Sequence, residues 1–136
     1  MGRNLERAIG ALNGLVGDYL HRTENGLATA MHLVREDRPI ELRREALAAV
    51  LPEPPRRVAV LVHGLMSTED VWRMEDGETY GSLLAKDVGL APFELRYNSG
   101  LRISENGEAL DVVRAGGLRA AQEEGMRGSA RPRRKG

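Results

Sequence analysis

The sequence predicts a protein of the α/β class, with an amphipathic helix, a β-hairpin and a strand–helix–strand unit in that order. Residues 58–62 form an uninterrupted apolar run rich in β-branched side chains, which is typical of a strand covered on both faces of a parallel sheet. Residues 80–88 place apolar side chains at helical spacing, and residues 91–97 predict another short strand. These three segments together form the crossover unit from which parallel sheets are built.

The composition is that of a folded globular chain. Its 136 residues suffice for one domain core, and 41% hydrophobic with 29% charged residues excludes a disordered or fibrous chain. The absence of cysteine excludes disulfides, thiolate metal sites and cysteine nucleophiles. The sequence contains neither a stretch of about 18 apolar residues nor a signal-peptide pattern. We therefore expect a cytoplasmic protein without stable membrane insertion.

The chain divides into three segments. Residues 1–25 form the N-terminal amphipathic helix, residues 26–113 a partial α/β domain, and residues 114–136 an irregular tail that we expect to be disordered. Residues 1–113 hold 13 basic and 18 acidic side chains, whereas residues 114–136 hold 7 basic and 2 acidic. The tail is therefore basic, although the formal net charge of the chain is zero.

The first helix carries its apolar side chains on one face. They recur three or four residues apart: Leu5, Ala8, Ile9, Leu12, Leu15, Val16, Tyr19 and Leu20. Asn25 and Gly26 follow as terminating residues. We expect the apolar face to cover a sheet edge; a partner helix and a membrane surface are the alternatives, although the polar face lacks the lysine-rich character of an interfacial helix.

Residues 28–33 and 40–42 flank the polar segment 35–38 and predict the β-hairpin. A short helix is expected at residues 43–51, because alanine, leucine and glutamate dominate there before three prolines, Pro52, Pro54 and Pro55. These prolines form a linker into the apolar run. We expect the strand at residues 58–62 to be central in the sheet.

The second half of the domain has clear helix boundaries. Gly89 is expected to end the helix at residues 80–88 in a left-handed cap. Ser104 or Asn106 caps a further predicted helix, which continues to Val113 and ends at Gly116 and Gly117. Beyond these glycines, apolar residues no longer recur at the spacing of a helix or a strand.

The candidate site is the place where the apolar strand runs directly into His63-Gly64 and a loop. This arrangement resembles the loop after the third strand of α/β-hydrolases, where a His-Gly pair lets the backbone turn sharply and present an N–H to the substrate oxyanion. Glycine is required because a side chain would block the close approach.

Further motifs strengthen the resemblance. In chain order they are Leu12-Asn13-Gly14-Leu15-Val16-Gly17-Asp18, His63-Gly64-Leu65, Trp72-Arg73, Tyr80-Gly81, Leu95-Arg96-Tyr97-Asn98-Ser99-Gly100 and Ile103-Ser104-Glu105-Asn106-Gly107. The set resembles a bacterial lipase- and esterase-like family similar to GPI inositol-deacylases, over residues 10–112. The resemblance implies the N-terminal half of an α/β-hydrolase sheet, a carboxylic or lipid ester as substrate, and no cofactor.

Carried over residue by residue, the resemblance implies that Leu65 supplies a backbone N–H of the oxyanion hole, with Met66 as the neighbouring candidate. Loss of one such donor typically raises the barrier by about 3–4 kcal/mol. His63 and Gly64 would shape the loop, and His63 would not act as the base. A buried turn histidine without a chemical task is the alternative for His63, and it suits the same geometry.

An enzyme of this family also needs a nucleophilic serine in Gly-x-Ser-x-Gly, followed by an acid and a histidine. The sequence contains no such serine motif and no histidine after His63. We therefore expect this chain to be inactive alone. The tail at residues 114–136 is rich in arginine, glycine, alanine and proline, which is typical of GC-rich coding sequence read out of frame. We therefore hypothesise that the tail is an out-of-frame or truncated end. Reading the gene in all frames tests this hypothesis.

Two other features have simpler interpretations. Residues 131–135 form a basic cluster that could bind nucleic acid, but it lacks interleaved aromatic residues, and a solvated tail is favoured. An acidic loop has no calcium-loop spacing, and we expect it to be a solvated surface rather than a metal site: Glu69, Asp70, Glu75, Asp76 and Glu78. Trp72 is expected to cover the core or line an acyl pocket, and His21 and His32 to be structural.

The alternative function is a non-catalytic interaction module. If the sheet ends after a hairpin and two parallel strands, one edge and one apolar face are open. Such a half-sheet would self-associate or pair with a complementary chain.

Overall fold

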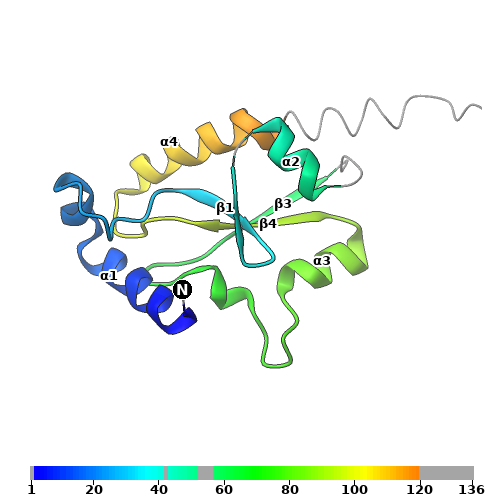
Figure 1. Ribbon diagram of the computed structural model, residues 1–136, viewed down its shortest axis with the longest axis horizontal. Helices are drawn as coiled ribbons and strands as arrows, with labels where there is room; N and C mark the ends of the chain where they lie inside the picture. Colours follow the sequence, from blue (N-terminus) through cyan, green and yellow to red (C-terminus); the bar gives the residue numbers. More distant parts are fainter. Residues whose placement is uncertain (1, 42, 52–56, 120–136) are drawn as a thin grey trace, which may run out of the picture.

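Four strands form one mixed sheet in the computed structural model, which describes residues 2–41, 43–51 and 57–119 (Figure 1). The strands are β1 (His32–Arg35), β2 (Arg38–Ile40), β3 (Val58–Val62) and β4 (Ala91–Arg96). Their order across the sheet is β2-β1-β4-β3. The β1 strand is antiparallel to both neighbours, and β3 is parallel to β4. The predicted α/β class, hairpin and crossover unit are confirmed.

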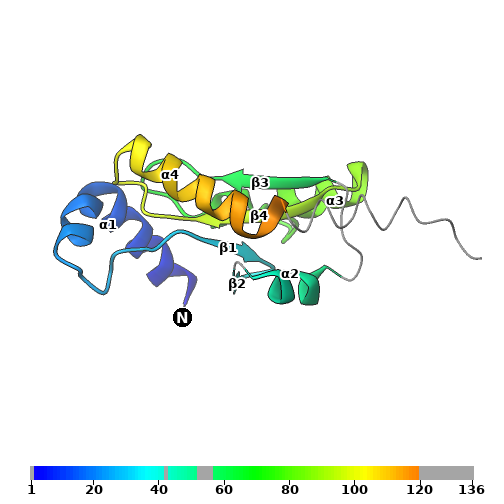
Figure 2. The same cartoon turned by 90° about the horizontal axis from the view of Figure 1, so that it is seen from above.

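Helices lie on both sides of this sheet. They are α1 (Arg3–Arg22), α2 (Arg44–Val50), α3 (Tyr80–Val88) and α4 (Ile103–Val113), with a 3-10 turn η1 (Glu69–Trp72) and a π-helical turn η2 (Arg114–Leu118). Helices α2 and α4 cover one face, whereas α1 and α3 lie on the other side (Figures 1 and 2). Because β3 and β4 are parallel, both end beside α1.

The hydrophobic core lies between the sheet and the α2–α4 layer. Phe93 and Leu95 of β4 are each 1% exposed and Leu33 of β1 is fully buried. They pack with Leu47 of α2 and Val113 of α4. Full burial of one such side chain contributes about 1.5–3 kcal/mol, so this face supplies most of the apolar stabilisation.

Local sequence explains the turns. Glu36 and Asp37, between β1 and β2, both have positive φ values, of 50° and 63°, as a two-residue type I′ hairpin turn requires. Helix α3 begins with a capping box, in which Thr79 and Ser82 exchange side-chain to backbone hydrogen bonds of 3.0 Å. Gly89 ends it at φ 67°, and the predicted left-handed cap is confirmed.

Three expectations about the elements are wrong. Strand β3 lies at the edge of the described sheet rather than in its centre, and Val62 is 43% exposed. Helix α4 begins after Arg102, whose N–H donates to the Glu105 carboxylate at 3.0 Å, so neither Ser104 nor Asn106 is the cap. The chain stays helical to residue 119 instead of becoming irregular at residue 114. The rest of the expected tail, residues 120–136 with its basic cluster at 131–135, lies outside the described residues, and so does the expected linker at Pro52, Pro54 and Pro55.

Helix α1 packs through a face that is rotated from the predicted one and shares only Leu20 with it. Its buried residues are Gly10, Asn13, Gly17 and Leu20. Among the predicted apolar residues, Leu5, Leu15 and Tyr19 are 52%, 68% and 58% exposed. Small residues allow the helix backbone to approach two loops closely, and this close approach outweighs burial of the apolar stripe. The helix changes direction at Val16, whose φ and ψ are −133° and 24°.

Candidate functional site

The His-Gly loop follows β3 at the carboxyl end of the two parallel strands. Ligands of open α/β sheets bind at this end, because loops there are free to vary while the strands hold their starting points fixed. The loop after β4, at residues 97–101, lies beside it, and α1 covers both loops (Figure 1). The sequence-predicted residues His63, Gly64, Leu65 and Met66 therefore lie at the expected end of the sheet.

His63 is a packed loop residue rather than a free base. His63 is 3% exposed, and its ring stacks on Tyr97 with ring centroids 4.4 Å apart. Its Nδ1 donates to the Gly64 carbonyl at 2.9 Å, which bends the loop around the ring. Burial lowers the pKa of His63 below its ordinary value, although the Gly64 bond opposes the shift, so the ring favours the neutral form. Its Nε2 has no hydrogen-bond partner within the described part of the chain.

Tyr97 holds the same loop from the other side. Its hydroxyl donates to the His63 carbonyl at 2.5 Å. Burial raises the pKa of Tyr97, so the hydroxyl keeps its proton and remains a donor. Ring stacking and this hydrogen bond together fix the end of β3 relative to the end of β4.

The two amides after Gly64 have different surroundings. The Met66 N–H donates to the Ser99 hydroxyl oxygen at 3.0 Å. For the Leu65 N–H, the hydrogen bonds among residues 2–41, 43–51 and 57–119 include no acceptor. Leu65 as a whole residue is 67% exposed. Of the two predicted donors, Leu65 is available and Met66 is already paired.

Met66 is held in an unusual backbone conformation. Its φ of 59° lies in the left-handed region, which costs a non-glycine residue roughly 1–3 kcal/mol unless its surroundings impose it. Helix α1 supplies this constraint, since a Cβ on Gly14 would lie 2.6 Å from both the nitrogen and Cα of Met66. Only glycine at this position lets the helix press against the loop.

The loop after β4 is attached to α1 in the same way. Asn98 is 2% exposed, and its Nδ2 donates to the Gly17 carbonyl at 2.9 Å. Its Oδ1 accepts from the Gly100 N–H at 3.0 Å. A Cβ on Gly17 would overlap the Asn98 side chain. Asn98 and Ser99 belong to one of the motifs that carry the family resemblance, but no role was predicted for them. The available signal was a polar pair just after a buried strand.

A buried ion pair fixes the start of α1 and η1 to the sheet. Glu69 is 6% exposed and accepts two hydrogen bonds from Arg96 of β4, with Nε donating to Oε2 at 2.9 Å and Nη2 donating to Oε1. Glu6 of α1 lies 3.5 Å from the same guanidinium. The paired carboxylate raises the pKa of Arg96, which stays charged.

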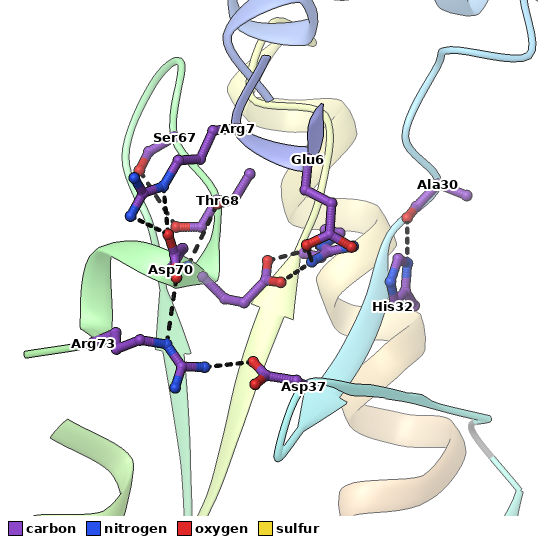
Figure 3. Close-up of polar contacts among 11 residues, drawn as sticks. Glu6, Arg7, Ala30, His32, Asp37, Ser67, Thr68, Asp70 and Arg73 are labelled. Atoms are coloured by element: carbon purple, nitrogen blue, oxygen red, sulfur yellow. Dashed lines mark hydrogen bonds and ion pairs between the residues drawn. The ribbon is translucent and has the colours of Figure 1, made fainter. Parts of the chain in front are cut away.

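A second set of charges links η1 to the hairpin (Figure 3). Arg73 pairs with Asp37 at 2.6 Å and with Asp70 at 3.4 Å, and Asp70 also pairs with Arg7 of α1. The expectation of a solvated acidic loop is therefore wrong for Glu69 and Asp70. Within the described residues, no group of three potential metal ligands comes together.

The remaining candidates lie away from the loop. Trp72 packs edge to face on Tyr80 with centroids 5.9 Å apart, and its Nε1 is buried without a partner in the described chain. His21 is exposed, and the Nδ1 of His32 lies 2.8 Å from the Ala30 carbonyl. Within the described residues, no serine hydroxyl is hydrogen-bonded to a histidine. In the described part of the chain, the loop thus holds a backbone amide without an acceptor, and no serine there is paired with a histidine.

Fold and site together define an α/β protein in which, among the described residues, one backbone amide at the carboxyl end of the parallel strands has no acceptor. No family model, curated protein or solved structure matches the chain. Among the described helices, none is long and apolar enough to cross a membrane.

Proposed function

We propose that this chain is the N-terminal part of an α/β-hydrolase sheet of the serine esterase or lipase type, acting on carboxylic or lipid esters. In this proposal, the Leu65 N–H is one donor of the oxyanion hole. The chain alone does not turn over esters, because it lacks the nucleophile, acid and base that form and resolve an acyl-enzyme.

One observation carries this proposal: β3 ends in a rigid loop that leaves the Leu65 amide unpaired beside the paired Met66 amide. A fixed, unpaired donor can stabilise charge without reorganising, which is the requirement for an oxyanion site. The neighbouring Met66 side chain, which is 42% exposed, suits the acyl part of an ester.

A titration with butyrate tests the donor directly. We expect a saturable change in the amide ¹H and ¹⁵N shifts of Leu65 in the full chain. Leu65→Pro removes the N–H and should weaken binding roughly tenfold or more, since a hydrogen bond to a charged group contributes about 1.5–3 kcal/mol. Leu65→Ala is the matched control, because it keeps the amide and changes an exposed side chain; it should bind like the unaltered chain.

The absence of a nucleophile is tested by activity. The purified chain should hydrolyse p-nitrophenyl butyrate no faster than buffer does. Turnover that a serine-directed reagent abolishes would contradict the proposal that this chain is inactive alone.

The open edge of β3 favours a second candidate, the interaction module. Within the described residues, β3 pairs with β4 alone, and its sequence carries neither charge nor proline to discourage pairing. In this case the chain self-associates, or pairs with a complementary chain, through β3.

Light scattering during size-exclusion chromatography separates the two candidates. Pairing through β3 predicts a mass that rises with concentration and returns to that of a monomer in Val62→Lys. Val112→Lys introduces the same charge at an exposed position of α4, 69% exposed, and should leave the association unchanged. A monomer at all concentrations would exclude self-association through β3.

A further inference from the structure

The Ser99 hydroxyl lies next to the candidate oxyanion amide with its own proton uncommitted. Its oxygen accepts from the Met66 N–H at 3.0 Å. A serine hydroxyl can accept and donate at the same time. Among the described residues, the hydrogen bonds of Ser99 include no acceptor for this proton. The hydroxyl can therefore donate to a ligand while it keeps its bond to Met66.

The position of this hydroxyl is fixed before any ligand binds. Asn98, the preceding residue, is buried and bonded to Gly17 of α1 and to the Gly100 N–H. The Asn98 carbonyl also accepts from the Asn106 side chain of α4 at 3.0 Å. Two helices thus anchor the residue next to Ser99, and a fixed donor loses little freedom when an anion binds.

The two donors are close enough to share one ligand. Consecutive backbone nitrogens are at most about 3.7 Å apart, so the nitrogen of Leu65 lies within about 6.7 Å of the Ser99 oxygen. A carboxylate spans this separation, because each of its two oxygens can accept a hydrogen bond of about 2.9 Å.

We propose that the Ser99 hydroxyl is the second donor of the anion site that the Leu65 amide begins. This inference rests on the proposed function and extends it. The bond to Met66 gives Ser99 a double role: it occupies the amide that would otherwise compete for the anion, and it orients its own proton toward the ligand. Ser99 is thus a binding residue, not the missing nucleophile.

The butyrate titration with Ser99 variants tests this inference. Ser99→Ala, which removes the hydroxyl, should weaken binding roughly tenfold or more, whereas Ser99→Thr, which keeps it, should restore affinity to within about twofold. Ser99→Cys is a second loss variant of similar size, because a thiol is a weak donor; it covers the case in which Ser99→Ala does not fold.

The two proposals fail in different ways. If Ser99 only positions the loop, the freed Met66 amide in Ser99→Ala and Ser99→Cys will change its shift while butyrate affinity at Leu65 stays the same or rises; this result overturns the inference alone. If butyrate leaves the Leu65 amide of the unaltered chain unchanged, the oxyanion assignment and the role of Ser99 are both overturned.

Discussion

Neighbouring residues of β4 face two different environments on opposite sides of the sheet. Phe93 and Leu95 are almost fully buried and pack beneath α2 and α4. Glu94 and Arg96 alternate with them and point to the other side, where Arg96 pairs with Glu69. One face is stabilised by apolar burial, whereas the other uses charge pairs and close glycine contacts. Contacts on the second face fix the positions of α1, η1 and the two loops of the site.

The largest effect is expected on the apolar face. Phe93→Ala removes a ring that is 1% exposed and should lower the free energy of unfolding by about 3–5 kcal/mol. Urea denaturation followed by circular dichroism measures it. Val112→Ala, at a position 69% exposed, is the control and should change stability by less than about 0.5 kcal/mol. Equal effects would mean that this face is not the core.

On the opposite face, Glu69→Ala leaves the Arg96 guanidinium without its main partner. Removing one member of a buried pair typically costs about 3–5 kcal/mol, and we expect the lower end because Glu6 remains nearby. Asp111→Ala breaks an exposed pair with Arg114, 2.8 Å long, and should cost at most about 0.5 kcal/mol. A Glu69→Ala variant as stable as the Asp111→Ala variant would show that the charge network does not anchor η1.

The close contact of α1 predicts an unusual response to alanine. Gly107→Ala in α4, where a Cβ would meet nothing within 4 Å, should stabilise the protein by roughly 0.5–1 kcal/mol, as expected in a helix. Gly17→Ala should instead destabilise it by about 1–3 kcal/mol, because the new methyl group overlaps Asn98. Thermal unfolding of both variants gives the comparison. Stabilisation by Gly17→Ala would exclude the packing described for α1.

The smallest effect concerns pH. Burial, and then the neighbouring carboxylates of Glu69 and Asp37, raise the pKa of Glu94 above its ordinary value of 4.5. The folded state holds the proton of Glu94 more tightly than the unfolded state does. The free energy of unfolding therefore decreases as pH rises from 4.5 through the raised pKa. Glu94→Gln should remove this decrease and stabilise the protein at neutral pH. Urea titrations at several pH values across that range measure the effect. If the unfolding free energy of the unaltered protein and of Glu94→Gln changed with pH at the same slope, Glu94 would not be the group responsible.

Sequence patterns were sufficient for the local elements. The apolar run at residues 58–62, the helix closed by Gly89 and the polar segment at residues 35–38 each have a local physical cause. The edge position of β3 was not predictable in this way, since an apolar strand has the same sequence pattern in the centre of a sheet. Strand neighbours depend on the whole topology.

Local sequence patterns also could not predict the orientation of α1 or the hydrogen-bond partners in the site. The apolar stripe of α1 predicted a buried face, but tertiary contacts through Gly14 and Gly17 select a rotated face that shares only Leu20 with it. The pairing of Met66 with Ser99 joins residues 33 positions apart, so no local pattern contains it. The sequence pattern predicts the loop and its candidate amides, and the structure shows which of the two amides is paired.

Hydrogen exchange of two neighbouring amides tests the central claim most directly. Measured by NMR in the ligand-free chain, the Leu65 amide should exchange at close to the rate of an unstructured peptide, whereas the Met66 amide, bonded to Ser99, should be protected at least roughly tenfold more. Protection of Leu65 comparable to that of the amides within β4 would contradict the account, because an amide already paired in the fold cannot serve as the oxyanion donor.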